Sequence, residues 1–315
     1  MAESRIDQLR MVDPVLTNIA QGYTPTNFIG DKLFPIVKVS AQKGKVPKFG
    51  KDSFVVRNSE RAIRSNSNRI PTSDYDTIEF TLRERDLEVA MDYIEEMETY
   101  DALKYEQKLT TDLLNLLALE REKVIADFVQ NPLNFDASSK KILEEGESFN
   151  NGGANPLTII TEAIEQLRQN IGRSPNIIVM GMDTYQAILT NSIIISYLMN
   201  SGLLKLSYEM LQKYFGINNI VVGTGVYSED GRLFKDIWQN NVIIAYVDQS
   251  EKSRRTQYNP SYGYTFQREG MPEIDSYYEN GGKIKIIRAT DNWEIKAVAP
   301  EAAFLINNTI QNLEV

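Results

Sequence analysis

The sequence predicts an α+β protein, because a long helical pattern in its first half is followed by alternating strands and helices and then by strands alone. Between residues 101 and 131, apolar residues recur every three or four positions, and neither Gly nor Pro interrupts the pattern. From residue 155 to residue 260, short apolar runs alternate with amphipathic segments, and from residue 261 onward the segments resemble strands. We therefore expect a long helix, a layered α/β unit and a β-rich end.

Composition excludes most catalytic chemistry. The chain contains no Cys and no His, which removes disulfides, thiolate nucleophiles, imidazole bases and the usual zinc ligands. No apolar run approaches the ~20 residues that span a bilayer, and the first residues lack the apolar core of a secretory signal. We therefore expect a structural or binding protein that is made in the cytosol and has neither a cofactor nor a membrane partner.

Residues 1–42 are expected to form a polar arm followed by a short strand. Pro14 and Gly22 leave room for at most one short helix, near residues 6–19. Residues 33–37 then supply the apolar run Leu-Phe-Pro-Ile-Val.

Residues 43–85 are expected to form an extended loop. Its strand-like parts, residues 54–56 and 77–82, flank a polar middle. A loop this long in a compact domain is usually functional or reaches for a partner.

Residues 86–154 contain the predicted long helix, 101–131, which would be about 45 Å long at roughly 1.5 Å per residue. Thr99 or Asp101 can cap its start, and Pro132 disfavours helical geometry in the residue before it. Four charged residues are interpreted as the exposed side of this helix: Glu120, Arg121, Glu122 and Lys123.

Residues 155–260 begin with Asn155 and Pro156, an N-cap and a first-turn proline, and the helix that they start is stopped by Gly172. Further helices are predicted from Asp183 and over 208–215. The predicted strands of this unit cover 177–180, 220–222 and 242–247. In the last segment, 261–315, strands are predicted over 264–268, 274–278, 283–288, 294–298 and 303–306, and they are expected to pack on the long helix.

The net charge is −9, and the charged residues of the first third are segregated by sign. Residues 42–70 hold eight bases and two acids, whereas residues 86–103 hold seven acids and no base. This pattern suggests complementary contact surfaces on different copies of the chain, although two unrelated solvated faces would also produce it. The basic contact residues would be Lys51, Arg57, Arg61, Arg64 and Arg69. The acidic contact residues would be Glu88, Asp92, Glu95, Glu96 and Glu98.

Two patterns could carry chemistry, and both have simpler explanations. Gly223 and Gly225 follow an apolar strand as in a dinucleotide-binding turn, but position 228, where a third glycine would fall, is Ser. The acids of residues 92–101 could gather a divalent cation or serve a carboxylate-based hydrolase, but a solvated acidic face or a contact for arginines explains them as well. We assign no catalytic residue, metal ligand or cofactor.

Several loose motifs follow one another in a fixed order along nearly the whole chain. They are Leu33-Phe34-Pro35, Lys45 to Gly50, Ile171-Gly172, Pro175-Asn176, Gly181, Tyr185, Phe215-Gly216-Ile217, Val221-Val222-Gly223, Ile237-Trp238 and Tyr246-Val247. In this order, with an arm, a loop and a long helix before them, they resemble the major capsid protein of tailed bacteriophages. Encapsulin shells and the herpesvirus capsid floor share that fold.

The resemblance implies a wedge-shaped subunit. It would consist of an arm (1–42), an extended loop lying over a neighbour (43–85), a peripheral domain with a spine helix (86–154), an axial domain (155–260) and a β-rich return to the peripheral domain (261–315). Residues 227–238 hold Glu229, Asp230 and Arg232 between two apolar strands, so they should project as a loop near a symmetry axis. Some members cross-link the loop through a Lys, and that reaction cannot be carried over because no Lys lies between Asp52 and Leu103.

The implied function is that of a non-enzymatic shell protein that assembles into pentamers and hexamers of an icosahedral capsid around double-stranded DNA. The implied partners are further copies of the chain, a portal protein, DNA held without sequence specificity and, in some members, a decoration protein. The protein would be assembled in the host cytoplasm and would end in the virion. An encapsulin-type compartment is the alternative with the same fold.

The short arm predicts that shell curvature depends on a separate scaffolding protein. Some members carry an internal scaffolding segment of roughly a hundred residues, largely helical, ahead of the Phe-Pro run, whereas 33 residues precede Phe34 here. Pro14, Gly22 and Pro25 do not support a long coiled coil in that space. We also expect no trimming of the arm by a maturation protease.

Overall fold

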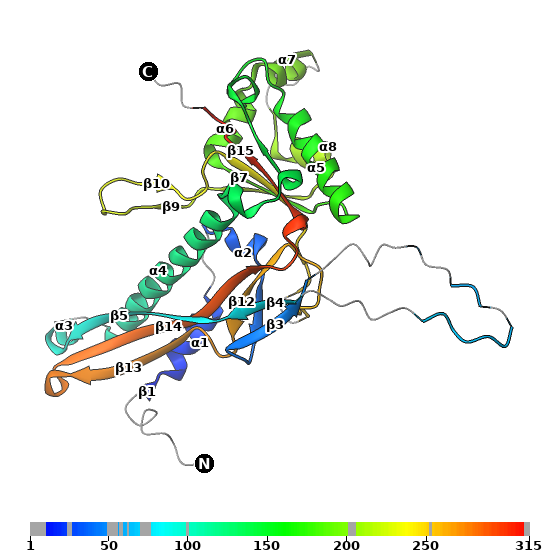
Figure 1. Ribbon diagram of the computed structural model, residues 1–315. Helices are drawn as coiled ribbons and strands as arrows, with labels where there is room; N and C mark the ends of the chain where they lie inside the picture. Colours follow the sequence, from blue (N-terminus) through cyan, green and yellow to red (C-terminus); the bar gives the residue numbers. More distant parts are fainter. Residues whose placement is uncertain are drawn as a thin grey trace.

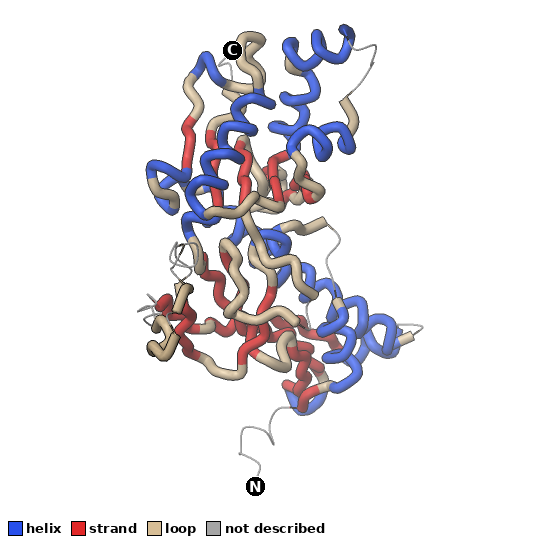
Figure 2. Tube along the Cα trace, turned by 90° about the vertical axis from the view of Figure 1, so that its right-hand side faces the viewer, coloured by secondary structure: helices blue, strands red, loops and turns tan. Residues whose placement is uncertain are grey.

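The computed structural model describes residues 11–23, 27–48, 56, 59–61, 63–69, 77–98, 101–200, 206–251 and 254–311. Helix α4 (Ala102–Gln130) connects two sheets, and Figure 1 shows it running from the lower sheet to the base of the upper one. Figure 2 shows the strands in two groups, one in each half of the molecule. The predicted mixture of one long helix, an α/β unit and a second set of strands is confirmed.

The larger sheet has six strands, and its central member is β14 (Ile284–Ala297). β14 pairs antiparallel with β13, β12 and β5, while β2 joins β12 in parallel and β1 joins the outer edge of β13. The bounds of its other strands are β1 (Met11–Val12), β2 (Ile36–Val39), β5 (Arg83–Asp92), β12 (Gly263–Arg268) and β13 (Glu273–Glu279).

Two helices cover one face of this sheet, α1 (Pro14–Gly22) and the first half of α4. Asp13 caps α1 by accepting hydrogen bonds from two backbone N–H groups, and Asp101 caps α4 by accepting one from Lys104. The apolar stripe of α4 is buried here against α1 and the sheet, through Leu16, Ala20, Leu113, Leu114, Leu117, Ile274, Ile287 and Ala289. The long helix and its capped start were predicted correctly from periodicity.

The smaller sheet has five strands in the order β6-β15-β11-β7-β8. Their bounds are β6 (Lys140–Ile142), β7 (Ile177–Gly181), β8 (Asn219–Gly223), β11 (Asn241–Ala245) and β15 (Ala303–Asn307). Alternate residues of β7 and β11 face opposite sides, and both sides are covered. One side packs on α5 (Pro156–Ile171), α6 (Met182–Thr190), α7 (Ser192–Asn200) and α8 (Tyr208–Phe215). The predicted cap at Asn155 and the predicted helix end at Gly172 are confirmed, and Gly172 and Gly216 both adopt the αL conformation after their helices.

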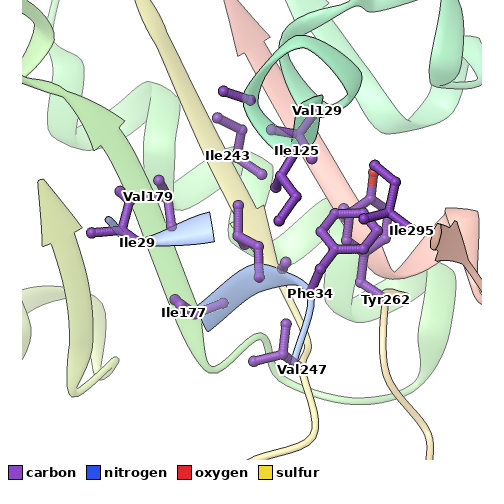
Figure 3. Packing of buried hydrophobic residues seen from close by; sticks show 14 of the residues in the cluster. Ile29, Phe34, Ile125, Val129, Ile177, Val179, Ile243, Val247, Tyr262 and Ile295 are labelled. Atoms are coloured by element: carbon purple, nitrogen blue, oxygen red, sulfur yellow. The ribbon is translucent and has the colours of Figure 1, made fainter. Parts of the chain in front are cut away.

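A shared core joins the two sheets. The other side of the five-stranded sheet packs on the second half of α4, and Phe34 and Tyr262 close the same cluster from below. Figure 3 shows Ile125 and Val129 of α4 beside Ile243, with Phe34, Tyr262 and Ile295 grouped next to them. Phe34 follows the short helix α2 (Gly30–Leu33) and is fully buried. The apolar run at 33–37 is therefore a connection between the sheets as well as a strand.

The extended loop begins differently from the prediction. Its paired strands are β3 (Lys43–Pro47) and β4 (Thr77–Thr81), in the register Lys45↔Glu79, so the partner of the predicted strand 77–82 is the segment 43–47. Residues 54 and 55 lie outside the described residues, and Val56 is almost fully exposed in irregular backbone. Pairing at 43–47 buries Val46 against Phe80 and the β12 ring Phe266.

Two expectations for the last segment, 261–315, were partly wrong. β14 runs unbroken through Asp291 and Asn292, which were expected to separate one strand from the next; both are buried and hydrogen-bonded. β15 does not return to the larger sheet but pairs between β11 and β6, because its residues 303–306 are apolar on both faces and fit the doubly covered sheet. β6, from the segment 86–154, belongs to this sheet as well.

Candidate inter-subunit surfaces

The basic surface lies on the extended loop. Arg61, Arg64 and Arg69 are exposed there, while Lys51 and Arg57 lie outside the described residues. Arg61 Nη1 donates to the Ser65 carbonyl at 2.7 Å, and Arg64 has a positive φ of 70°. The loop therefore turns sharply between Arg61 and Ser65, and all three arginines are exposed.

The acidic surface lies on β5 and the following short helix α3 (Tyr93–Glu98). Glu88 accepts a hydrogen bond from the Tyr277 hydroxyl at 3.0 Å, which raises the pKa of Tyr277. Asp92 accepts from the Ile94 N–H while Glu95 accepts from the Asp92 N–H, so these two acids form a capping box. Glu98 is exposed at the end of α3, and the side chain of Glu96 lies outside the described residues.

Within a single chain, the basic surface and the acidic surface lie far apart. β4 and β3 lie at one end of β5, and α3 lies at its other end (Figure 1). Ten residues of strand span about 33 Å, so the base of the loop and α3 are far apart. A contact between the described residues of these surfaces would need a second copy of the chain.

A third surface is a hairpin of two short strands, β9 (Val226–Tyr227) and β10 (Lys235–Asp236), which projects from the molecule beside the end of α4 (Figure 1). Its turn contains the predicted residues Glu229, Asp230 and Arg232, all exposed. Asp230 accepts hydrogen bonds from the N–H groups of Arg232 and Leu233, and these bonds lower its pKa. The expectation of a projecting loop is confirmed; its place relative to a symmetry axis stays a prediction.

A buried carboxylate on α4 was missed by sequence reasoning. Glu122 was assigned to the exposed side of the helix, but it is 3% exposed. Its oxygens accept hydrogen bonds from Ile29 N (2.9 Å), Gly30 N (2.7 Å) and Trp238 Nε1 (2.7 Å). Burial raises the pKa of Glu122 despite these donors. One side chain thus ties the arm, the long helix and the segment after the hairpin together.

The neighbouring Arg121 is also largely buried, contrary to the prediction. Its guanidinium lies 3.3 Å from a carboxylate oxygen of Asp31 and 3.3 Å from one of Asp291. Burial raises the pKa of Asp291, and Arg121 opposes that rise. Glu120 and Lys123 conform better to the prediction: Glu120 pairs at the surface with Arg85, and Lys123 lies over the ring of Tyr227. Arg121 and Glu122 thus lie inside while Glu120 and Lys123 lie at the surface, and charge alone did not reveal this difference.

The glycines that resembled a dinucleotide-binding turn have a packing role. A Cβ on Gly223 would lie 2.3 Å from the Trp238 ring, so only glycine leaves room for that ring. Gly225 is followed by strand β9 and not by a helix. No group of three or more carboxylates among the described residues is close enough to hold a metal ion. Within the described ranges, no helix combines the length and apolarity needed to cross a bilayer.

Comparison with known proteins gives matches along nearly the whole chain. The chain is 39% identical over 304 residues to the major capsid protein of Burkholderia phage BcepMu, covering 96% of this chain and 98% of that protein. No model of a known protein family matches the chain.

The solved structures agree. A phage-related protein from Bordetella bronchiseptica RB50 superimposes with a TM-score of 0.81 at 26% identity, covering 95% of this chain and 98% of that one. The SrpI encapsulin of Synechococcus elongatus superimposes with a TM-score of 0.51 at 11% identity, covering 96% of this chain and 99% of the other, which is a likeness of fold alone.

Proposed function

The chain belongs to the family of phage major capsid proteins, and we propose that its copies join as pentamers and hexamers of an icosahedral shell. It is a structural protein of the virion and not an enzyme. The observation that carries the proposal is the 39% identity that extends over 96% of the chain, since a match of that extent includes the loop, the long helix and both sheets. The encapsulin-type compartment shares the fold at far lower identity and remains the second candidate.

The contacts that we propose between copies use the two charged surfaces. The basic loop residues of one subunit, Arg61, Arg64 and Arg69, would face the acidic residues Glu88, Asp92, Glu95 and Glu98 of a neighbour. The opposite signs of the surfaces and their separation within one chain support this pairing. We include Lys51, Arg57 and Glu96 in this contact on the basis of the sequence, because Lys51, Arg57 and the side chain of Glu96 lie outside the described residues.

The further partners are double-stranded DNA, a portal protein, a separate scaffolding protein and, in some shells, a decoration protein, with assembly in the host cytoplasm. A net charge of −9 disfavours tight binding of the DNA backbone. We therefore propose that the shell contains DNA without recognising its sequence.

Sedimentation and electron microscopy of the purified protein test assembly. At micromolar concentration we expect closed shells or ring-shaped capsomers, and shells of uneven size when no scaffolding protein is present. A single monomer boundary across a range of salt would refute assembly. Nuclease-protected DNA in particles from infected cells would separate a capsid from a protein compartment.

Charge reversal tests the loop. The double variant Arg61→Glu with Arg64→Glu should raise the protein concentration needed for assembly and leave the melting temperature of the subunit unchanged. Each exposed pair is worth only ~0–1 kcal/mol, but a shell repeats it in every subunit. Arg61→Lys with Arg64→Lys is the matched control, because it keeps both charges. Equal assembly of the reversed and the control variants would show that the loop does not act through its charge.

A further inference from the structure

The tip of the β9–β10 hairpin carries two large apolar side chains that the subunit does not bury. Leu233 and Phe234 are 72% and 74% exposed, next to each other in the sequence. The turn before them is fixed, because Asp230 accepts from two backbone N–H groups, Gly231 adopts a φ of 72°, and Lys235 pairs with Glu229 at 3.0 Å. We name Leu233 and Phe234 the apolar tip. A rigid projection loses little conformational entropy when a partner covers it.

The root of the hairpin is anchored as firmly as its turn. Ile237 and Trp238 are buried directly after β10, and Glu122 of α4 accepts the indole N–H of Trp238. Gln130 of α4 donates to the Ile237 carbonyl at 2.9 Å and accepts from the Gln239 N–H. The apolar tip is therefore held at a fixed place relative to the long helix.

A cavity of about 370 Å³ lies beside the base of the extended loop, between β2, β3 and residues 255–258. Val37 and Phe80, which are 5% and 4% exposed, contribute apolar atoms to its wall, and the exposed ring of Tyr258 stands at its edge. Lys45 and Arg255 also line it. Among the described residues, the buried Nε of Arg255 has no hydrogen-bond partner. We name this the loop-base cavity; it offers apolar contact and positive charge together.

The apolar tip and the loop-base cavity lie on opposite sides of the subunit. Figure 1 shows the hairpin projecting to one side of the molecule and the β3–β4 pair on the other. A ring of identical subunits is closed by a head-to-tail contact, in which one patch meets a different patch on the next copy. We propose that the apolar tip of one subunit docks in the loop-base cavity of the next subunit in the ring. This docking rests on the proposed function, because it needs copies of the chain to form rings.

Charge supports the same pairing. Between Glu229 and Asp236 the hairpin carries three acids and two bases, whereas the cavity is lined by three bases, Lys38, Lys45 and Arg255, and by one acid, Glu269. Lys45 is itself paired with Glu79 at 2.8 Å, so the excess of positive charge at the cavity comes mainly from Lys38 and Arg255. Opposite charges at the rim steer two surfaces together and set their register, while the desolvated apolar centre supplies most of the affinity.

A second cavity, of about 300 Å³, lies at the root of the same hairpin and includes Phe28, Leu116 and Val226. Because it lies at the root of the hairpin that carries the tip, it would suit a reciprocal two-fold pair, in which each tip enters the cavity of the other copy. It is therefore the competing receptor, and the experiment must separate the two.

Disulfide cross-linking makes that separation, since the chain has no cysteine of its own. Leu233→Cys combined with Tyr258→Cys should give, in oxidised particles, a ladder of covalent oligomers beyond the dimer. Leu233→Cys combined with Leu116→Cys tests the second cavity, and each single variant is a control. Cross-links form only where the Cα atoms come within about 7 Å. A ladder from the first pair supports the docking; a dimer from the second pair, or assembled particles without cross-links from the first, would overturn it.

A substitution without cysteine gives an independent test. Phe234→Ser should raise the protein concentration needed for assembly at least tenfold without changing the melting temperature of the subunit. Leu133→Ser is the matched control, because Leu133 is 87% exposed and lies outside the hairpin. If Phe234→Ser assembles like the control, the inference is wrong while the proposed function stands. If the unaltered chain forms no rings or shells, the proposed function itself fails.

Discussion

The two sheets joined by α4 differ in how completely the subunit itself covers them. Every residue of β7 and of β11 is buried, so the five-stranded sheet is covered on both faces by side chains of its own chain. In the six-stranded sheet, β5 has one buried residue in ten and carries charged residues along most of its length. The first sheet is complete within one subunit, whereas the second leaves a face open to other molecules.

The side chains packed against the two sheets also differ in polarity. Apolar side chains from four helices fill the space above the five-stranded sheet. The six-stranded sheet has apolar clusters as well, but it also holds charged groups in pairs, such as the bidentate pair of Arg288 with Asp275 and the contact of Arg121 with Asp291. Buried pairs require specific partners and contribute less net stability than apolar packing. Apolar packing thus stabilises the half of the subunit that contains the five-stranded sheet, and polar networks contribute to the geometry of the half that contains the six-stranded sheet.

The largest effect is expected from a cavity in the five-stranded sheet. Phe304→Ala in β15 should lower the free energy of unfolding by about 3–5 kcal/mol, because the ring is 1% exposed and its neighbours cannot fill the space. Leu87→Ala in β5 is the control from the other sheet; Leu87 is 38% exposed, and a loss below about 1 kcal/mol is expected. Urea unfolding of the unassembled subunits measures both. Equal losses of unfolding free energy in the two variants would show that the two sheets do not differ in how much their side chains are buried.

The second-largest loss of stability is expected at Glu122, where the two sheets are joined. Glu122→Ala leaves three buried donors without an acceptor, and at about 1–3 kcal/mol for each unsatisfied group the loss should be about 3 kcal/mol or more. Trp238 fluorescence should change as well, because the indole N–H loses its partner. Glu120→Ala, at a surface ion pair on the same helix, should cost only ~0–1 kcal/mol. A small loss for Glu122→Ala would mean that water or another acceptor replaces the carboxylate.

A substitution where the extended loop is attached to the six-stranded sheet should affect mainly the strands at the base of the loop. Phe80 stacks on Phe266 with ring centroids 4.4 Å apart, and this contact joins β4 to the six-stranded sheet. Phe80→Ala should speed amide exchange in β3 and β4 several-fold, with a smaller change in the global unfolding free energy. Phe80→Leu keeps most of the apolar contact and should protect those amides better. If amide exchange became faster to the same extent in both sheets, the loop base would not be a separate unfolding unit.

The smallest effect is in the pH dependence of stability. Burial raises the pKa of Glu122 in the folded state above its ordinary value of 4.5, so the folded protein binds that proton more tightly than the unfolded chain. The resulting stabilisation is present below the unfolded pKa and is lost as the pH rises through the folded pKa.

Glu122→Gln should remove that contribution to the pH dependence. The difference in unfolding free energy between the wild type and this variant should change by at most about 1.4 kcal/mol per pH unit in that window. Asp291 also has a raised pKa, but it titrates in both proteins and cancels from the difference. Glu120→Gln should leave the slope unchanged, and a flat difference for Glu122→Gln would mean that its pKa is the same in both states.

The sequence by itself determined the elements whose signals are local. The three- and four-residue spacing predicted α4, Asn155 and Gly172 marked the ends of α5, and continuous apolar runs predicted β7 and β11. These signals depend on residues a few positions apart, so no knowledge of the remaining chain is needed to read them. The charge segregation was likewise evident from the order of charged residues, and the projection of residues 227–238 from the polar residues between two apolar strands.

Tertiary structure alone decided the features that depend on distant partners. Glu122 is buried because donors from the arm and from a tryptophan 116 residues away converge on it, and no local pattern distinguishes it from the exposed Glu120. β14 passes through Asp291 because Gln267 and Arg121 satisfy that carboxylate inside the fold. β15 pairs with β11 and β6 because the five-stranded sheet buries both of its faces. A polar or charged residue can lie inside only where distant donors and acceptors meet it, and their arrival is set by the fold of the whole chain.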